Sequence, residues 1–355
     1  MIAEIEKEIS EIIKDDGLSK YDYLRITSEK DIPVPEPSIT FGHASVATPG
    51  NITAISAAAK VGKTAVAGVI LSGAISRTGI TDGFGEDFKI KPNTNGLAVL
   101  NFDTEQSQDD QQRNLNAILR RANIKSTPDY YGEYNIRQLS IKDYKAVTDE
   151  ICNLYYKKFG GIHMIVIDGG ADYILSVNDE EASAEIIQFF THLAIRHNCP
   201  VIVIVHQNPS NQKFQSEAKE RGHFGSQIQR KCYGLLSITK DGDISTLSAK
   251  MLRRGGNDTP EIHFKYCYES GYHKALEPGF KENRERAIKI ESLRKIAAES
   301  FSPLNRYTYR QALDCIIDIT GKSERTVKDY LRDMKDNNII IQDDDKCYRL
   351  VQLNT

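Results

Sequence analysis

The sequence contains no run of apolar residues long enough to cross a lipid bilayer, which argues against a membrane-spanning helix. Its first residues also lack the basic start and apolar centre of a signal peptide. The six cysteines are widely scattered, and no two form a Cys-x-x-Cys pair, so neither a zinc site nor a disulfide framework is indicated. The net charge of −3 favours no particular class of partner. These absences predict a cytoplasmic protein without membrane association.

The 355 residues change in character along the chain, which indicates two domains or one large domain with an appendage. Residues 1–37 combine an amphipathic helical pattern over residues 2–15 with a proline-rich linker at residues 32–37. Between residues 38 and 278, apolar β-branched runs alternate with helical patterns, as in an α/β domain on a mostly parallel sheet. Residues 279–355 are richer in charge and in short elements, and we expect a separate small domain there.

Strands buried on both faces read as nearly continuous aliphatic runs, and several segments of residues 38–278 fit that pattern. The best strand candidates are Ile52–Ser56, Leu97–Phe102, Met164–Ile167 and Val201–Val205. Helical patterns between them include Asp109–Ala122 and Asp179–His197.

The first of these strands leads into a phosphate-binding loop (P-loop). An apolar strand, a loop of small residues ending in Gly-Lys-Thr and an apolar helix follow one another, which is the setting of a nucleoside triphosphate site. Ala57 stands where the first glycine of the motif is usual. Lys63 would reach the β- and γ-phosphates, and the Thr64 hydroxyl would bind Mg²⁺. The residues predicted to bind the nucleotide, ATP or GTP, are Ala58, Ala59, Lys60, Val61, Gly62, Lys63, Thr64 and Ala65.

A second motif is the apolar run that ends in Asp168, the Walker B pattern, whose carboxylate would hold Mg²⁺. In many hydrolysing P-loop families a glutamate follows this aspartate and polarises the attacking water. Here the next residue is Gly169. Either another residue acts as the base, or the protein does not hydrolyse the nucleotide.

Glu105 is the candidate base, because it follows a core strand whose carboxyl end opens on the same sheet edge as the P-loop. Its alternative role is to cap the helix that follows. Another strand ends in His206 and Gln207, either of which could contact the γ-phosphate and sense its loss. These two residues could equally be satisfied polar groups at a strand end.

The order of these motifs resembles the RecA-like ATPase core. Within that group, the chain is similar to hexameric replicative helicases of the plasmid RepA type and their relatives on bacterial mobile elements. The resemblance covers about residues 38–275. It rests on the residues 58–64, 101–107, 222–226 and 250–255.

The resemblance implies a ring-forming homo-oligomer, a hexamer in that family, with ATP and Mg²⁺ at the subunit interfaces. A neighbouring subunit would supply a positive side chain to the γ-phosphate, and Lys250 and Arg253 fit that role by position. The relatives more often show Lys-x-Arg, whereas this chain has Lys-x-x-Arg-Arg, so Arg253 and Arg254 are not distinguished. A solvated basic strand end is the alternative interpretation.

Two regions are candidates for contact with DNA. RecA-like proteins resemble one another in placing a DNA-contacting loop after the strand that ends here at Gln207. In this loop Lys213, Lys219 and Arg221 would bind phosphates of single-stranded DNA, with Phe214 available for stacking on bases. A plain surface loop is the alternative.

The C-terminal region has the order helix, turn, helix and hairpin that is typical of a winged helix. We expect helices over residues 307–319 and 324–337, with Ser323 as the cap of the second, and strands over 339–342 and 347–351. On the second helix Arg325, Lys328 and Arg332 would contact duplex DNA. Acidic residues are nearly as numerous as basic ones in this region, and winged helices also dock proteins.

The sequence therefore predicts a RecA-like α/β P-loop ATPase with a winged-helix domain, a Mg²⁺-dependent hydrolase and helicase that acts on DNA in replication or mobilisation of a bacterial element. Two alternatives stay open. One is a switch that binds ATP and DNA, for transcription or copy-number control, without unwinding. The other is a small-molecule kinase, which would be monomeric and independent of DNA.

Overall fold

The computed structural model describes residues 18–80, 82, 84–207, 222–255, 259–277 and 279–351. The helix predicted over residues 2–15 lies outside these ranges, as do residues 208–221 of the predicted DNA-contacting loop. Residues 18–37 contain one short 3-10 helix, η1 (Ser19–Leu24), and most of their side chains are exposed. None of the described helices combines the length and the apolarity that crossing a membrane requires.

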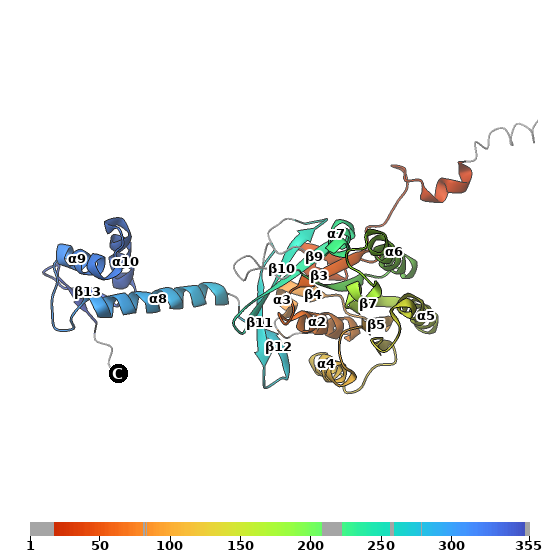
Figure 1. Cartoon of the computed structure of the whole chain (residues 1–355), viewed down its shortest axis with the longest axis horizontal. Coiled ribbons are helices and arrows are strands. Elements are labelled where there is room, and N and C mark those ends of the chain that lie inside the picture. The colour runs from red at the N-terminus through yellow and green to blue at the C-terminus, as the bar shows by residue number, and fades with distance from the viewer. Residues whose placement is uncertain are drawn as a thin grey trace, which may run out of the picture.

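A mixed sheet forms the centre of residues 38–278 (Figure 1). Among the described residues it has nine strands, in the order β12-β11-β10-β9-β3-β8-β7-β5-β6. Their bounds are β3 (Ile52–Ala57), β5 (Ala98–Asp103), β6 (Tyr131–Asn135), β7 (Ile162–Asp168), β8 (Val201–His206), β9 (Gly234–Asp241), β10 (Ile244–Leu252), β11 (Ile262–Cys267) and β12 (Tyr272–Ala275).

In this order, the strands β9, β3, β8, β7, β5 and β6 each pair in parallel with the next. The strands β9, β10, β11 and β12 pair with one another in antiparallel fashion. β3, β5 and β8 are buried along nearly their whole length, which explains their aliphatic composition. β8 lies between the P-loop strand β3 and the Walker B strand β7. The predicted fold class, a RecA-like α/β fold with a mostly parallel central sheet, is confirmed.

Helices cover both faces of this sheet, each over its own apolar core. Residues of α2 and α4 contribute to one core, and residues of α5, α6 and α7 contribute to the other. The helices are α2 (Lys63–Ile75), α3 (Phe84–Asp87), α4 (Gln108–Arg121), α5 (Ile141–Phe159), α6 (Glu180–His197) and α7 (Gly222–Lys231), with the 3-10 helix η2 (Gly170–Tyr173) after β7.

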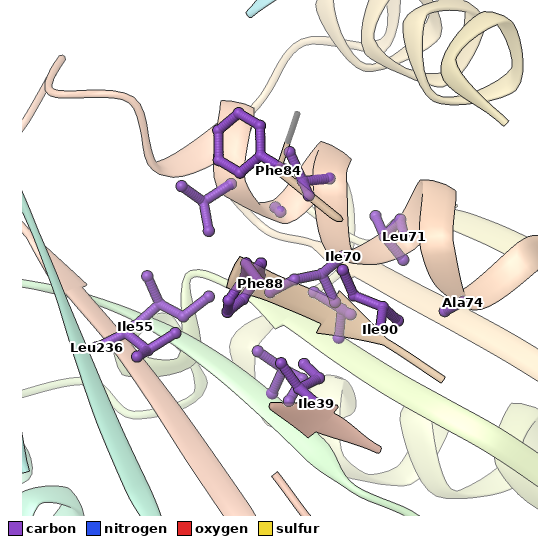
Figure 2. Packing of buried hydrophobic residues seen from close by; sticks show 14 of the residues in the cluster. Ile39, Ile55, Ile70, Leu71, Ala74, Phe84, Phe88, Ile90 and Leu236 are labelled. Atoms are coloured by element: carbon purple, nitrogen blue, oxygen red, sulfur yellow. The ribbon is translucent and has the colours of Figure 1, made fainter. Parts of the chain in front are cut away.

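The P-loop helix α2 is apolar around its whole circumference because it is packed on two sides. A small antiparallel sheet of β1 (Ile39–Phe41), β2 (Ala44–Ala47) and β4 (Phe88–Ile90) shares its core. Figure 2 shows Ile70 and Leu71 of α2 close to Phe88 and Ile90 of β4. Gly73 allows this approach, since a Cβ atom there would lie 2.6 Å from the Cβ of Ile90.

The C-terminal part has a third, separate core. Its elements are α8 (Phe280–Ser300), α9 (Tyr309–Thr320), α10 (Glu324–Asp336), β13 (Ile340–Gln342) and β14 (Tyr348–Leu350). Figure 1 shows α8 leading from the main sheet to this core. The side chain of Ser323 caps α10, as predicted, and Tyr307 pairs with Tyr348 in an isolated antiparallel β-bridge. The helices and the hairpin thus have the order of a winged helix.

Candidate functional site

Parallel strands bring the predicted site residues to one edge of the sheet. β3 leads into the P-loop, β5 ends just before Glu105, β7 ends at Asp168 and β8 ends at His206. In the strand register Asp103 lies opposite Asp168, and Ala57 lies opposite His206. The carboxyl ends of parallel strands are where α/β sheets bind ligands, so the topology assembles a site here.

The P-loop backbone has left-handed conformations at Lys60 (φ 63°) and Gly62 (φ 110°). A Cβ atom at Gly62 would lie 3.0 Å from a ring carbon of Phe264 on β11, so this position requires glycine. Lys63 then begins α2, whose first turn presents unpaired amides to an anion. Of the other loop residues predicted to bind nucleotide, Ala59 and Lys60 are exposed, Val61 is buried, and Ala58, Thr64 and Ala65 are partly buried.

Three side chains from different elements meet at this edge. The Lys63 Nζ atom lies 2.9 Å from Nδ1 and 2.8 Å from Nε2 of His206, and 3.9 Å from Oε2 of Glu105. His206 Nε2 lies 2.7 Å from Oε1 of Glu105. The P-loop lysine, the candidate base and the end of β8 are therefore in direct contact.

The charges of this cluster act on one another. The hydrogen bond from His206, followed by the charge of Lys63, lowers the pKa of Glu105, so this carboxylate is ionised at neutral pH. Burial lowers the pKa of Lys63, while the charges of Glu105, Asp168 and Asp172 act against that shift. Burial, together with the nearby Asp103 and Glu105, raises the pKa of Asp168 to about 7.

Asp168 has the surroundings that a cation requires. Its side chain is buried, and Oδ1 has no hydrogen-bond partner among the described residues. Among the described residues, no three or more histidine, cysteine, aspartate or glutamate side chains are grouped so that they could hold a metal ion by themselves. Mg²⁺ commonly binds through one or two carboxylates together with substrate phosphates. Asp168 and the Thr64 hydroxyl at the start of α2 fit this mode.

Gly169 explains why the usual glutamate is absent after the Walker B aspartate. Its φ is +91°, and a Cβ atom would lie 1.9 Å from Oγ1 of Thr104. A glutamate therefore does not fit there. The helix-capping role considered for Glu105 is taken by Ser107, whose side chain accepts a hydrogen bond from the Asp110 amide at the start of α4.

Gln207 is placed differently from His206. Its side chain is buried, with Nε2 3.4 Å from Oγ of Ser237 on β9, the strand on the other side of β3. Its backbone amide donates to the carbonyl of Ala57. His206, rather than Gln207, contacts Lys63 and Glu105.

The two predicted trans residues lie near the end of β10. The register of β10 with β9 shifts between Ala249 and Met251, so Lys250 is the extra residue of a bulge. The Arg253 guanidinium donates to the carbonyls of Arg230, Lys231 and Cys232, at the C-terminal end of α7. Arg254 is exposed.

The predicted nucleic-acid residues divide into two groups. Lys213, Phe214, Lys219 and Arg221 lie outside the described residues. Arg325, Lys328 and Arg332 are exposed on α10. Lys328 pairs with Glu324 at 2.8 Å, and Arg332 pairs with Asp329 at 3.0 Å, so acidic neighbours partly neutralise this helix.

Sequence reasoning missed the polar residues beside the site. Asp103 accepts hydrogen bonds from the backbone amides of Glu105 and Gln106, both at 2.8 Å. Thr104 Oγ1 lies 2.7 Å from Oδ2 of Asp172. The available signal was their position, because Asp103 and Thr104 directly precede Glu105, and Asp172 lies in the short segment that follows Asp168.

The comparisons with known proteins cover the part of the chain that contains this site. Residues 43–212, a little under half of the chain, match a family described as AAA domain. No curated protein matches the chain. A solved structure, "Crystal structure of the RadB recombinase", is similar at 16% identity and a TM-score of 0.42, over 64% of this chain and 92% of that one. Lys63, Glu105, Asp168 and His206 all fall within residues 43–212, the part of the chain that is similar to the AAA domain.

Proposed function

We propose that this protein is an ATP-dependent, helicase-like ATPase that acts on DNA in the replication or mobilisation of a bacterial plasmid or other mobile element. The contact between Lys63, His206 and Glu105 carries the proposal. It joins the phosphate-binding lysine and the candidate base to the end of β8. β8 leads into residues 208–221, the position at which RecA-like proteins contact DNA.

Hydrolysis would depend on Glu105. Its carboxylate is ionised and would orient a water molecule toward the γ-phosphate, while Lys63 would neutralise developing charge. Mg²⁺ held by Thr64 and Asp168 would supply further neutralisation of the phosphates. His206 lies within hydrogen-bond distance of Lys63. A bound phosphate would therefore compete with His206 for Lys63. The His206 side chain would then be released, and its change of position would transmit the presence of the γ-phosphate to β8.

The site would be completed by a second subunit in a ring, as in the family that the sequence resembles. Lys250 and Arg253 are both candidates for the trans residue, and a bulge re-aims the side chain of Lys250. Arg253 would first have to leave the three carbonyls of its own chain. Each hydrogen bond from a charged group typically contributes about 1.5–3 kcal/mol when buried and less when exposed.

Single-stranded DNA would pass the ATPase part, and the winged helix would bind duplex DNA through Arg325, Lys328 and Arg332. A second candidate function is a regulatory switch that binds ATP and DNA without unwinding. The ion pairs of α10 favour it, because cations already paired with acidic neighbours gain less from DNA phosphates. Unwinding distinguishes the two functions.

The first test is steady-state ATP hydrolysis with and without single-stranded DNA, for the wild type and for Glu105→Gln. The variant is expected to bind ATP but not to hydrolyse it, whereas Asp109→Asn, an exposed change on α4, should behave as the wild type. Undiminished hydrolysis by Glu105→Gln would remove Glu105 from the mechanism. A hydrolysis rate that DNA does not change would favour the switch. DNA-stimulated hydrolysis without unwinding in a strand-displacement assay would also favour it.

A further inference from the structure

Thr104, Asp172 and Glu105 converge on the backbone of Gly169. A Cβ atom built there would lie 1.9 Å from Thr104 Oγ1, 2.9 Å from Asp172 Oδ2 and 3.2 Å from Glu105 Cγ. The backbone amide of Thr104 donates to the carbonyl of Asp168 at 3.1 Å. The strand that precedes the candidate base is thus joined to the turn that follows the Walker B aspartate.

The Thr104 hydroxyl has one proton and three acceptors within reach. Asp172 Oδ2 lies 2.7 Å away, and the carbonyl oxygens of Asp168 and Gly169 lie 3.1 and 3.3 Å away. The carboxylate is both the nearest acceptor and the only charged one of the three, so the hydroxyl donates to it. This hydrogen bond links β5 to η2 through two side chains.

The backbone next to Thr104 is also held from the other side. Asp103 accepts the amides of Glu105 and Gln106, both at 2.8 Å. Two sets of hydrogen bonds therefore hold the backbone around Glu105. Asp103 at the end of β5 closes the turn that contains Glu105. Thr104 links the same segment to η2, which follows the neighbouring strand β7. Without the link from Thr104, the position of Glu105 relative to Asp168 would depend on the backbone pairing between β5 and β7 and on the contacts of Glu105 with His206 and Lys63.

We propose that Thr104 and Asp172 are positioning residues for hydrolysis, whose hydrogen bond fixes the Glu105 carboxylate relative to Asp168. This inference rests on the proposed ATPase function. Orientation effects are steep, since a misplacement of about 1 Å can cost a hundredfold in rate. Loss of the hydroxyl should therefore act on turnover rather than on nucleotide binding, because Lys63 and the P-loop are untouched.

Thr104→Val removes the hydroxyl at nearly constant volume and keeps the Asp172 charge. We expect kcat for ATP hydrolysis to fall at least about tenfold, with KM and the dissociation constant of ATP changed less than about twofold. Thr104→Ser restores a hydroxyl and should recover most of kcat. The matched control is Thr148→Val. It removes another buried hydroxyl, one 2.8 Å from the Tyr173 hydroxyl on η2, without touching the Glu105 loop, and its kcat should equal that of the wild type.

A double-mutant cycle completes the test. If Thr104 and Asp172 act through one hydrogen bond, Thr104→Val combined with Asp172→Ala should be no slower than the slower single variant. Equal kcat in Thr104→Val and the wild type, multiplied losses in the double variant, or an equal loss in Thr148→Val would overturn the inference while the ATPase proposal stands. A wild type that binds ATP and never hydrolyses it would overturn both.

Discussion

Asp168→Asn is expected to stabilise the nucleotide-free protein while it abolishes Mg²⁺-dependent hydrolysis. The wild-type carboxylate is buried with Oδ1 unpartnered, and burial, Asp103 and Glu105 raise its pKa from 3.8 to about 7. Because the folded-state pKa lies above the unfolded value, the folded state disfavours the ionised group. An asparagine side chain has the same shape and no charge to desolvate.

The magnitude follows from the shift in pKa. Roughly three pKa units at about 1.36 kcal/mol each correspond to about 4 kcal/mol of destabilisation once Asp168 is ionised in both states. This cost begins above the unfolded pKa, near pH 4, and is complete above the folded pKa, near pH 7. At pH 5 it amounts to about 1.5 kcal/mol. The stability difference between variant and wild type should therefore grow by roughly 2–3 kcal/mol between pH 5 and pH 8.

The assay is urea unfolding of both proteins at pH 5, 6, 7 and 8, without nucleotide or divalent cations. Asp109→Asn serves as the exposed control and should follow the wild type at every pH. Adding Mg²⁺ and ATP should raise the unfolding midpoint of the wild type more than that of Asp168→Asn, since ligands stabilise the state that binds them. A stability difference that stays constant from pH 5 to pH 8 would refute the reasoning. So would a variant less stable than the wild type at pH 8.

Three further predictions concern the same edge of the sheet. Gly169→Ala should destabilise the protein by at least about 2 kcal/mol and lower kcat, because the methyl group meets Thr104. Gly160→Ala, also at positive φ but with no atom within 4 Å of the new Cβ, should cost only about 1–2 kcal/mol. His206→Ala should bind ATP more tightly than the wild type, measured with a fluorescent nucleotide, because the side chain nearest to Lys63 then no longer competes for it; weaker binding would mean that His206 itself contacts the phosphates. When Arg253→Ala and Lys63→Ala subunits are mixed, the ATPase activity should be no higher than that of either variant alone if Arg253 only supports α7. Recovery of activity in the mixture would place Arg253 in the site of a neighbouring subunit.

The sequence predicted the central part of the fold well because buried parallel strands are unmistakably aliphatic. The runs that end near Phe102, Ile167 and Val205 each proved to be a strand, extended to a polar terminal residue. The antiparallel strands β9 to β12 were not predicted individually. β10 and β11 are buried at only two positions each, β12 is partly buried throughout, and all three carry polar side chains, so they lack that signal.

The candidate site was predictable in outline and not in its contacts. Motif order brought Lys63, Glu105 and Asp168 to one edge, because parallel strands share their carboxyl ends. Whether His206 or Gln207 faces Lys63 depends on where β8 ends and the chain changes direction. The alternation of side chains along a strand does not determine this at the strand's last residue. The link from Thr104 to Asp172 joins residues 68 positions apart, and only the fold shows it.

The packing of α2 between the main sheet and the small sheet has a mechanical consequence. Every sideways or lengthwise shift of this helix would open a void in a core where Ile70, Leu71 and Ala74 are almost completely buried. A cavity as large as a leucine side chain costs about 2–5 kcal/mol, a substantial share of the binding energy of a nucleotide. The P-loop end of α2 is therefore expected to stay in place when a nucleotide binds. Nucleotide-driven displacement is expected where packing is lighter, as at His206, which is only partly buried.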